Sequence, residues 1–573
     1  MKLIFRYLRP LSRTLAFGLT VKMLATLFEL TLPYILSYIL DEIVPKGEIS
    51  LILIWGAVMI VAAVLAMTCN VIANRNASGV ARDASRAIRH DLFAATMHLS
   101  SRQADAFTVP SLESRLTSDT YNVHQFLRTL QVAAIRVPIL LLGGIAITLV
   151  LDWRLALVLI AALPLIGGSV YLVTRRGLPL FRRTQTAVDN MVRVVREDCQ
   201  GVRVIKALSR EAYEIERFDN ANSELIARER RAKVTMAASQ PLMTLFLNIG
   251  LVAVIVTGVY LVNGNLSSPG RIIAFIQYFT LMSGAMTAMT RIFTMSTRST
   301  ASANRIAEIL EAGDTSRRTD TKALAADDAR YIVFDDVCFS YGGKKNNLDH
   351  VSFTLPKGGT LGVIGATGSG KTTLATLLMR FYDIDSGSIL IGGEDIYAMD
   401  SKRLHGLFGV VMQNDFIIAD SIAENIRFGR DIPMDDVRRA ARIAQAADFI
   451  EAFPDGFEHQ LTAKGTNVSG GQRQRILIAR ALAGNPDILV LDDASSALDY
   501  KTDAALRTAI REELADTTTV IVTQRVSSVK HADYILVLDH GCVIGAGRHE
   551  ELLESCAAYR EISDSQMGGA FLD

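Results

Sequence analysis

A succession of apolar runs without charged residues, concentrated in the first half, constrains this chain more than any other feature. Residues 51–73 and 237–262 contain no Asp, Glu, Lys or Arg. A helix of about 20 such residues is long enough to cross a hydrocarbon core of about 30 Å. Buried helices of a large soluble protein are the alternative, but repeated runs of this length favour a membrane domain.

Further apolar segments raise the expected number of spans to six, and the short turn at residues 152–154 must join two of them in a helical hairpin. The first span carries Lys22 and Glu29, which lie seven residues apart and therefore share a helical face. Charges in lipid are costly, so we expect both to face a partner or a wet cavity. We predict spans at about residues 14–43, 51–73, 132–151, 155–175, 237–262 and 270–297, in an all-α membrane domain at residues 1–313.

Basic residues predict the orientation of these spans. Arginines crowd the stretches between the second and third spans and between the fourth and fifth, whereas the opposite loops hold little beyond Lys46, Arg154 and Arg271. By the positive-inside rule, both termini and both long loops are cytoplasmic, in a bacterial plasma or inner membrane. The long loops also have helical patterns, so we expect the spans to continue as long cytoplasmic extensions. The opening MKLIFRYLRPLSR has no cleavage site and is expected to lie on the cytoplasmic surface.

The second half has the pattern of a water-soluble α/β domain. A polar segment without periodicity marks a linker at residues 314–329, and strand-like and helical segments follow over residues 330–573. The formal net charge of +1 gives no argument for a nucleic-acid partner. The five cysteines are scattered and odd in number, which suits a reducing compartment and argues against a disulfide framework.

A phosphate loop lies in this second domain. The segment GATGSGKTT follows the apolar strand TLGVI and opens a helical segment. Glycines let backbone N–H groups turn toward phosphates, the lysine reaches the β- and γ-phosphates, a hydroxyl meets Mg²⁺, and the helix N-terminus favours the anion. The predicted nucleotide-binding residues of this loop are Gly365, Thr367, Gly368, Ser369, Gly370, Lys371, Thr372 and Thr373.

Other segments resemble the motifs of the ATP-binding cassette (ABC) family. VSGGQRQR resembles the family signature, with Val468 in place of the usual leucine, ILVLDD resembles the Walker B strand, and SALD resembles the D-loop. Gln413 and Tyr341 stand where a Q-loop glutamine and an adenine-stacking tyrosine would be. The resemblance covers essentially the whole chain and implies an exporter-type half-transporter with a P-loop ATPase domain. It also implies ATP and Mg²⁺ as cofactors and a second half-transporter chain as partner.

The resemblance assigns roles to individual residues. It implies that Thr372, Gln413 and Asp492 hold Mg²⁺, a hard cation that takes oxygen ligands. The signature opens a helix whose N–H groups form a second anion site, and the resemblance implies that this site faces the γ-phosphate bound on a partner chain. The signature residues are Val468, Ser469, Gly470, Gly471 and Gln472, and the D-loop residues are Ser496, Ala497, Leu498 and Asp499.

Two catalytic positions depart from the family pattern. Asp493 stands where the family has a glutamate that polarises the attacking water, and Gln524 stands where it has a histidine. Aspartate is one methylene shorter, about 1.5 Å, and a general base must come within about 2.6–3.2 Å of its proton. We therefore predict a degenerate site that holds ATP and hydrolyses it slowly, in a heterodimer with a catalytically complete partner. A slow homodimeric exporter, an importer with an exporter fold, and an ATP-gated regulator or channel are the alternatives.

The transported substrate is not named by the sequence. Met282, Met286 and Met289 share one face of the sixth span, which suits an adaptable apolar cavity or ordinary packing between helices. A drug-like compound, a lipid or a peptide all fit. Residues 112–120 and 201–211, in the two long loops, resemble the segments that couple the family's membrane and ATPase domains.

Overall fold

The computed structural model describes residues 2–312, 328–343, 345–413 and 416–567. Contacts divide the chain into two compact units, one formed by Met1–His98 with Phe107–Gly313 and the other by Leu99–Ala106 with Asp314–Asp573. The short segment Leu99–Ala106 therefore groups with the second unit although it lies in the first long loop. Residues 314–327 of the expected linker lie outside the described residues.

The described part of the first unit is helical, as expected for backbone that must satisfy its own hydrogen bonds in lipid. Within the described residues, six helical stretches are long and apolar enough to cross a membrane, which confirms the predicted membrane domain, while their limits in the bilayer stay a prediction. The helices are α1 (Lys2–Leu8), α2 (Ser12–Tyr38), α3 (Ile49–Met97), α5 (Val109–Ser114), α6 (Thr120–Pro138), α7 (Gly144–Leu151), α8 (Trp153–Ala207), α9 (Glu211–Ala237), α10 (Ser239–Asn263) and α11 (Pro269–Leu310). Helix α4 (Ser101–Phe107) lies almost wholly in the segment Leu99–Ala106, which groups with the second unit. Wider π-helical turns, η2 (Ile39–Ile43), η4 (Arg115–Asp119) and η5 (Ile139–Gly143), continue α2, α5 and α6.

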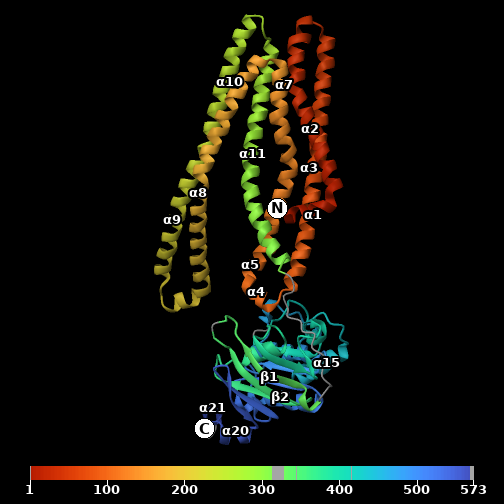
Figure 1. Cartoon of the computed structure of the whole chain (residues 1–573), viewed down its shortest axis with the longest axis vertical. Helices are drawn as coiled ribbons and strands as arrows, with labels where there is room; N and C mark the ends of the chain where they lie inside the picture. Colours follow the sequence, from red (N-terminus) through yellow and green to blue (C-terminus); the bar gives the residue numbers. More distant parts are fainter. Residues whose placement is uncertain (1, 313–327, 344, 414–415, 568–573) are drawn as a thin grey trace. The chain divides into compact units, whose positions relative to one another are not determined.

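The long helices run side by side and extend well beyond a bilayer. Helix α3 has 49 residues and α8 has 55, against the roughly 20 that a span needs. Figure 1 shows α8 and α9 as a long hairpin, with α2 and α3 on the other side of the unit and α11 between them. The hairpin between α7 and α8 is present because Asp152 caps α8, accepting a hydrogen bond from the Arg154 backbone N–H at 3.0 Å.

The charged residues of the first span have partners on neighbouring helices of the same unit. Lys22 is buried and donates to the side-chain oxygens of Asn70 and Asn74 on α3. Glu29 accepts two hydrogen bonds from the guanidinium of Arg136 on α6, at 2.7 and 3.2 Å. Buried charge is tolerated when it is paired and hydrogen-bonded in this way, so these residues join α2 to α3 and α6.

Two of the three methionines on one face of α11, Met282 and Met286, pack against neighbouring helices. A Cβ built on Gly144 would lie 3.0 Å from the sulfur of Met282, and one on Gly167 would lie 2.9 Å from the terminal methyl of Met286. Met282 is fully buried, whereas Met289 is 58% exposed. Close packing against glycines of α7 and α8 therefore accounts for Met282 and Met286.

The described residues of the second unit form two sheets. One has the strand order β2-β1-β4-β5 with antiparallel neighbours, and the other has the order β10-β9-β3-β8-β7-β6 and is parallel except for its β10 edge. The strands are β1 (Ile332–Phe339), β2 (Leu348–Leu355), β3 (Thr360–Gly365), β4 (Ser386–Ile391), β5 (Glu394–Asp395), β6 (Phe408–Val411), β7 (Ile488–Asp492), β8 (Thr518–Val522), β9 (Tyr534–Asp539) and β10 (Cys542–Gly547). This architecture confirms the predicted α/β ATPase fold.

Helices cover the parallel sheet and enclose its core. They are α12 (Lys371–Leu378), α13 (Ser401–Gly406), α14 (Ile422–Arg427), α15 (Met434–Ile443), α16 (Ala447–Glu451), α17 (Gly470–Leu482), α18 (Tyr500–Glu513), α19 (Val526–Val529), α20 (His549–Ser555) and α21 (Ala557–Met567). Every residue of β7 is buried, as expected for a strand covered on both faces. Strands β3, β8 and β7 are neighbours, so their carboxyl ends bring three loops to one edge of the sheet.

Candidate nucleotide-binding site

A pocket opens at the carboxyl edge of β3, β8 and β7. It brings together the phosphate loop, the end of the Walker B strand, the Q-loop glutamine and the loop after β8, which lie far apart in the sequence. Most of the predicted site residues of these segments line it. The lining residues are Asn347, Thr367, Gly368, Gly370, Lys371, Thr372, Thr373, Gln413, Asp492, Asp493, Val522, Thr523 and Gln524.

The phosphate loop has a backbone shape that requires glycine. Gly368 and Gly370 have φ angles of +82° and +102°, and a Cβ on Gly370 would lie 2.7 Å from the carbonyl oxygen of Asn347. The buried Lys371 ammonium donates to the carbonyl oxygens of Gly365 and Ala366 at 2.9 and 2.7 Å. Burial lowers the pKa of Lys371. A phosphate in the pocket offers this ammonium anionic acceptors in place of neutral carbonyls.

The predicted metal-binding residues have the chemistry that suits a hard divalent cation. Thr372 Oγ1 donates to Asp492 Oδ1 at 3.2 Å, which places the hydroxyl and the carboxylate side by side. Within the described residues, Asp492 Oδ2 and Ser369 Oγ are buried without a hydrogen-bond partner. Burial raises the pKa of Asp492. A buried oxygen without a partner is costly, and Mg²⁺ bound by carboxylate, hydroxyl and water would satisfy it.

The two departures from the family pattern both border the pocket. Asp493 follows the end of β7 with a left-handed backbone, φ +52°, and its N–H donates to the Val522 carbonyl at 2.8 Å. Burial raises the pKa of its carboxyl group, and the nearby Arg525 guanidinium opposes that shift. Gln524 Nε2 donates to Thr367 Oγ1 at 3.4 Å, so this amide lies beside the phosphate loop.

The signature residues do not line the pocket. They form the start of α17, where Ser469 and Gln472 cap the helix reciprocally: the Gln472 N–H donates to Ser469 Oγ at 3.2 Å, and the Ser469 N–H donates to Gln472 Oε1 at 2.9 Å. Val468 packs at the edge of the neighbouring apolar core, and Gly470 and Gly471 open the first turn. The Ser469 hydroxyl proton is not used by this cap, because Ser469 Oγ accepts in it.

The D-loop residues surround the start of α18 and are tied to the signature helix. Gln474 on α17 donates to the Asp493 carbonyl and accepts from the Ala497 N–H, at 3.1 and 2.9 Å, and also donates to Ser496 Oγ at 3.3 Å. Asp499 caps α18, and Leu498 is buried beneath the loop. The predicted D-loop is therefore connected to the predicted signature, but Ser496, Ala497, Leu498 and Asp499 do not line the pocket.

Tyr341 also stands outside the pocket lining. It is 44% exposed and contacts the rings of Phe339 and Tyr382 edge-on, with centroid distances of 4.8 and 4.9 Å. An exposed ring on an aromatic support can stack on a flat base, so the adenine contact stays a prediction. Gly365 and Ser369 lie in the loop but not on the pocket wall.

Five residues that contribute to this region were not predicted. Asn347, Val522 and Thr523 line the pocket, and Gln474 joins α17 to the D-loop. The Arg525 guanidinium donates to the carbonyls of Ser496 and Leu498 in the D-loop and of Ser495 just before it, at distances of 3.0–3.4 Å. Gln474 lies inside the signature segment, so its position could have been noted. Asn347 has no local signal, because only tertiary folding brings the residue before β2 to the phosphate loop.

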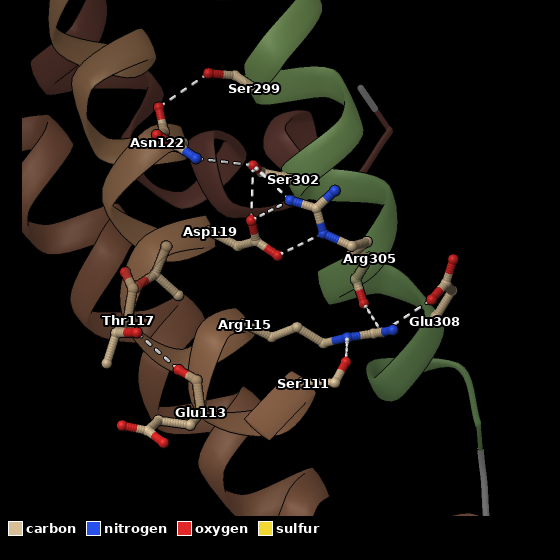
Figure 2. A network of polar contacts seen from close by, with 11 residues as sticks. Ser111, Glu113, Arg115, Thr117, Asp119, Asn122, Ser299, Ser302, Arg305 and Glu308 are labelled. Atoms are coloured by element: carbon tan, nitrogen blue, oxygen red, sulfur yellow. Dashed lines mark hydrogen bonds and ion pairs between the residues drawn. The ribbon is translucent and has the colours of Figure 1, made fainter. Parts of the chain in front are cut away.

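A polar network joins the first expected coupling segment, residues 112–120, to the end of α11 (Figure 2). Arg305 on α11 donates two hydrogen bonds to the carboxylate of Asp119, and the Nε bond measures 2.8 Å. The Ser302 hydroxyl donates to the same carboxylate at 2.9 Å. Arg115 pairs with Glu308 at 2.9 Å and donates to the Arg305 carbonyl. Two arginines thus face two acids, and the charges balance.

Two further contacts extend this network toward α6. Asn122 donates to Ser302 Oγ at 3.1 Å, and Ser299 Oγ donates to the Asn122 carbonyl at 2.9 Å. The side chain of Asp119 is 2% exposed, which leaves it little access to water. By contrast, residues 201–211, at the turn between α8 and α9, are largely exposed. One of the two expected coupling segments is therefore held firmly by α11.

Comparisons with known proteins agree with the two-unit architecture. The family model of the ABC transporter transmembrane region matches residues 15–286, and the ABC transporter model matches residues 348–496. Uncharacterized ABC transporter ATP-binding proteins of Mycobacterium tuberculosis (strain ATCC 25618 / H37Rv) and Bacillus subtilis (strain 168) are 32% and 34% identical, over 98% of this chain and 98% and 96% of theirs. An ATP-dependent lipid A-core flippase of Vibrio parahaemolyticus is 30% identical over 84% of this chain and 83% of its own length.

A solved structure has the same fold over nearly its whole length. It is that of a bacterial Atm1-family ABC exporter with ATP bound, and it superposes with a TM-score of 0.84 at 24% sequence identity. The match covers 97% of this chain and 99% of the other. At this identity the likeness establishes the arrangement of helices and strands.

Proposed function

We propose that this chain, which belongs to the ABC transporter family, is the ATP-holding half of a heterodimeric exporter. Family membership makes it a multi-pass membrane protein whose ATPase domain uses ATP and Mg²⁺. The observation that carries the proposal is the contrast within one domain: Asp493 and Gln524 border the pocket, while an unmodified Ser-Gly-Gly-Gln sequence opens α17 away from it.

The proposal assigns slow hydrolysis to the pocket of this chain. An aspartate at position 493 places its oxygens about 1.5 Å short of where a glutamate would reach, and well-placed proton transfer contributes about 10²–10⁴-fold to rate. Gln524 can donate a hydrogen bond to a phosphate but cannot carry the positive charge of an imidazolium. Phosphate binding uses other groups, the glycine backbone and Lys371, so retention of ATP survives these two replacements.

The signature of this chain would complete the catalytic site of the partner. The first turn of α17 presents unpaired N–H groups and the positive end of the helix dipole, which favour a phosphate. The Ser469 hydroxyl can donate to that phosphate while Ser469 Oγ keeps its cap on the Gln472 N–H. Each chain then supplies a different half of the chemistry: this chain supplies the signature, and the partner supplies the base.

We propose that the Asp119–Arg305 network helps to couple the membrane domain to the ATPase domain. Residues 112–120 follow shortly after Leu99–Ala106, the segment that groups with the ATPase unit, and α11 leads toward the same unit along the chain. Charge-balanced contacts around the buried Asp119 and Arg115 make a rigid connection. A movement of the first long loop is then passed to α11, one of the helices that cross the membrane.

Export of an amphiphilic compound is the transport activity that we propose, with the ATPase domain in the cytoplasm. The flippase relative is named for a lipid A-core substrate, which favours a lipid among the drug-like, lipid and peptide classes. The exposed, adaptable side chain of Met289 on α11 is compatible with an apolar ligand.

Steady-state ATP hydrolysis by the purified chain, alone and with a co-purified partner half-transporter, tests the proposal. The chain alone should bind ATP and hydrolyse it poorly, and the heterodimer should turn over orders of magnitude faster. Rapid hydrolysis by a verified homodimer would exclude the heterodimer. ATP-dependent uptake of a fluorescent phospholipid into inverted vesicles tests direction, since loss of preloaded probe would indicate an importer, and an ATP-gated conductance would indicate a channel.

A further inference from the structure

The segment Gln524, Arg525 and Val526, which we call the switch segment, connects the pocket with the D-loop. It follows β8 and ends at the first residue of α19. The amide of Gln524 points to the phosphate loop, where it donates to Thr367 Oγ1 at 3.4 Å. The guanidinium of Arg525 donates to the carbonyl oxygens of the D-loop, that of Ser496 at 3.0 Å. The backbone of the switch segment therefore decides what both of these neighbours contact.

The C-terminal helix α21 holds this backbone through one side chain. Gln566 Nε2 donates to the Gln524 carbonyl at 2.7 Å, and the Val526 N–H donates to Gln566 Oε1 at 2.8 Å. The side-chain amide of Gln566 thus pairs with the carbonyl of Gln524 and with the N–H of Val526, two residues later. A neighbouring strand in a sheet makes the same pair of bonds. The residues that these two bonds join are 40 and 42 positions apart in the sequence.

The position of Gln566 is fixed by the packing of α21. Tyr559 is fully buried, and its hydroxyl lies 2.7 Å from His549 Nδ1. Tyr559 belongs to the same apolar cluster as Val526 and Val529 of α19. Helix α21 is therefore anchored to α19, whose first residue, Val526, is the last residue of the switch segment. The side chain of Gln566 is itself exposed, so its hydrogen bonds are not a by-product of burial.

We propose that Gln566 is a positioning residue, which sets the switch segment so that Gln524 faces the nucleotide and Arg525 holds the D-loop. The proposal rests on the proposed nucleotide site and extends it to the end of the chain. Gln566 does not touch the nucleotide. It acts through the backbone of Gln524, at the γ-phosphate end of the pocket, so its effect should be felt by ATP and not by ADP.

Isosteric replacement separates hydrogen bonding from packing. Gln566→Glu keeps the size of the side chain and the acceptor for the Val526 N–H, but it places a carboxylate against the Gln524 carbonyl. Gln566→Ala removes both bonds. Ser565→Ala, at the exposed neighbouring position of α21, is the matched control. Thermal unfolding of each full-length variant shows whether folding is intact.

The measurement is the ratio of MgADP to MgATP dissociation constants, obtained by competition with a fluorescent nucleotide on the purified full-length chain in nanodiscs. Gln566→Glu and Gln566→Ala should each reduce this preference for ATP about fivefold to tenfold, the effect of losing one to two hydrogen bonds. Ser565→Ala should leave it unchanged. In a Gln524→Ala background, Gln566→Ala should have no further effect, because its action passes through Gln524.

An unchanged ATP preference in Gln566→Glu, or fully additive effects of Gln566→Ala and Gln524→Ala, would overturn the positioning role. These outcomes differ from failure of the proposed function. Rapid hydrolysis by the wild-type chain alone would contradict the division of labour between subunits, whereas the comparison of the Gln566 variants would still decide the positioning role.

Discussion

At the scale of single residues, the groups proposed to bind phosphate differ from those proposed to transfer protons. Binding rests on backbone N–H groups held by Gly368 and Gly370 and on the buried Lys371 ammonium. Proton transfer would rest on Asp493, whose left-handed backbone fixes the direction of a short side chain. Because these are different groups, the pocket can keep its affinity for ATP while it loses its rate of hydrolysis.

The first residue-scale prediction separates these two properties. Lys371→Ala should lower the affinity of this chain's pocket for ATP by about tenfold to a hundredfold, the effect of losing a hydrogen bond to a charged group. Turnover at the partner's site should partly survive, and alanine at the partner's own phosphate-loop lysine should abolish it. Nucleotide binding and steady-state hydrolysis of the two variant heterodimers provide the test. Equal loss of hydrolysis in both would mean that the sites are equivalent.

A second prediction concerns a double variant that restores the two missing groups. Asp493→Glu together with Gln524→His should add hydrolysis at this chain's pocket, because the longer carboxylate reaches the water and an imidazolium supports the γ-phosphate. A well-placed base contributes about 10²–10⁴-fold. Vanadate-trapped ADP per heterodimer should rise from one site to both. The single variants are the controls, and an unchanged trapping stoichiometry in the double variant would contradict the prediction.

At the scale of elements, the polar network of Figure 2 joins the buried Arg115 and Asp119 of the first long loop to α11. Asp119→Asn should destabilise the chain by about 1–3 kcal/mol. A fully buried pair costs about 3–5 kcal/mol to break, but the partner Arg305 is 47% exposed and water screens part of its charge. Thr117→Ala is the control in the same turn, because that hydroxyl bonds only locally, to the Glu113 carbonyl.

Thermal unfolding of Asp119→Asn, Arg305→Gln and the double variant in detergent tests this connection. The double variant should be no less stable than Asp119→Asn, because removing Arg305 also removes the charge left without a partner. Fully additive destabilisation would show that the two residues act independently.

Sequence patterns predict the elements of this chain but not the contacts between residues that are distant in the sequence. The spans, the phosphate loop and the Walker B strand were predictable because each is a local pattern: a charge-free run, a glycine spacing, an apolar strand that ends in Asp492. Their meeting at one sheet edge follows from parallel strand order. The Asp119–Arg305 contact joins residues 186 apart, and the Gln566 contacts join residues at least 40 apart. No local pattern reports such pairs, since only tertiary packing brings them together.

At the scale of the whole molecule, the proposed function has the signature and the pocket of one chain serve different nucleotides. Ser469 and the first turn of α17 do not line the pocket that holds Lys371 and Asp492. In the proposed heterodimer, a second chain brings phosphate to the signature. If that chain carries the missing glutamate and histidine, the heterodimer has one fast and one slow site, and the contribution of this chain to the fast site is Ser469.

The most direct test compares Ser469→Ala with Asp493→Asn in the heterodimer, measured as steady-state ATP hydrolysis at saturating ATP. A preorganised donor to a transition-state oxyanion contributes about 2.7–4 kcal/mol, or about 10²–10³-fold in rate. Ser469→Ala should therefore cause a loss of this size, while Asp493→Asn should leave turnover nearly unchanged although Asp493 follows Asp492, the predicted metal ligand. Equal damage by the two variants would show that this chain's own pocket is catalytic and would contradict the division of labour.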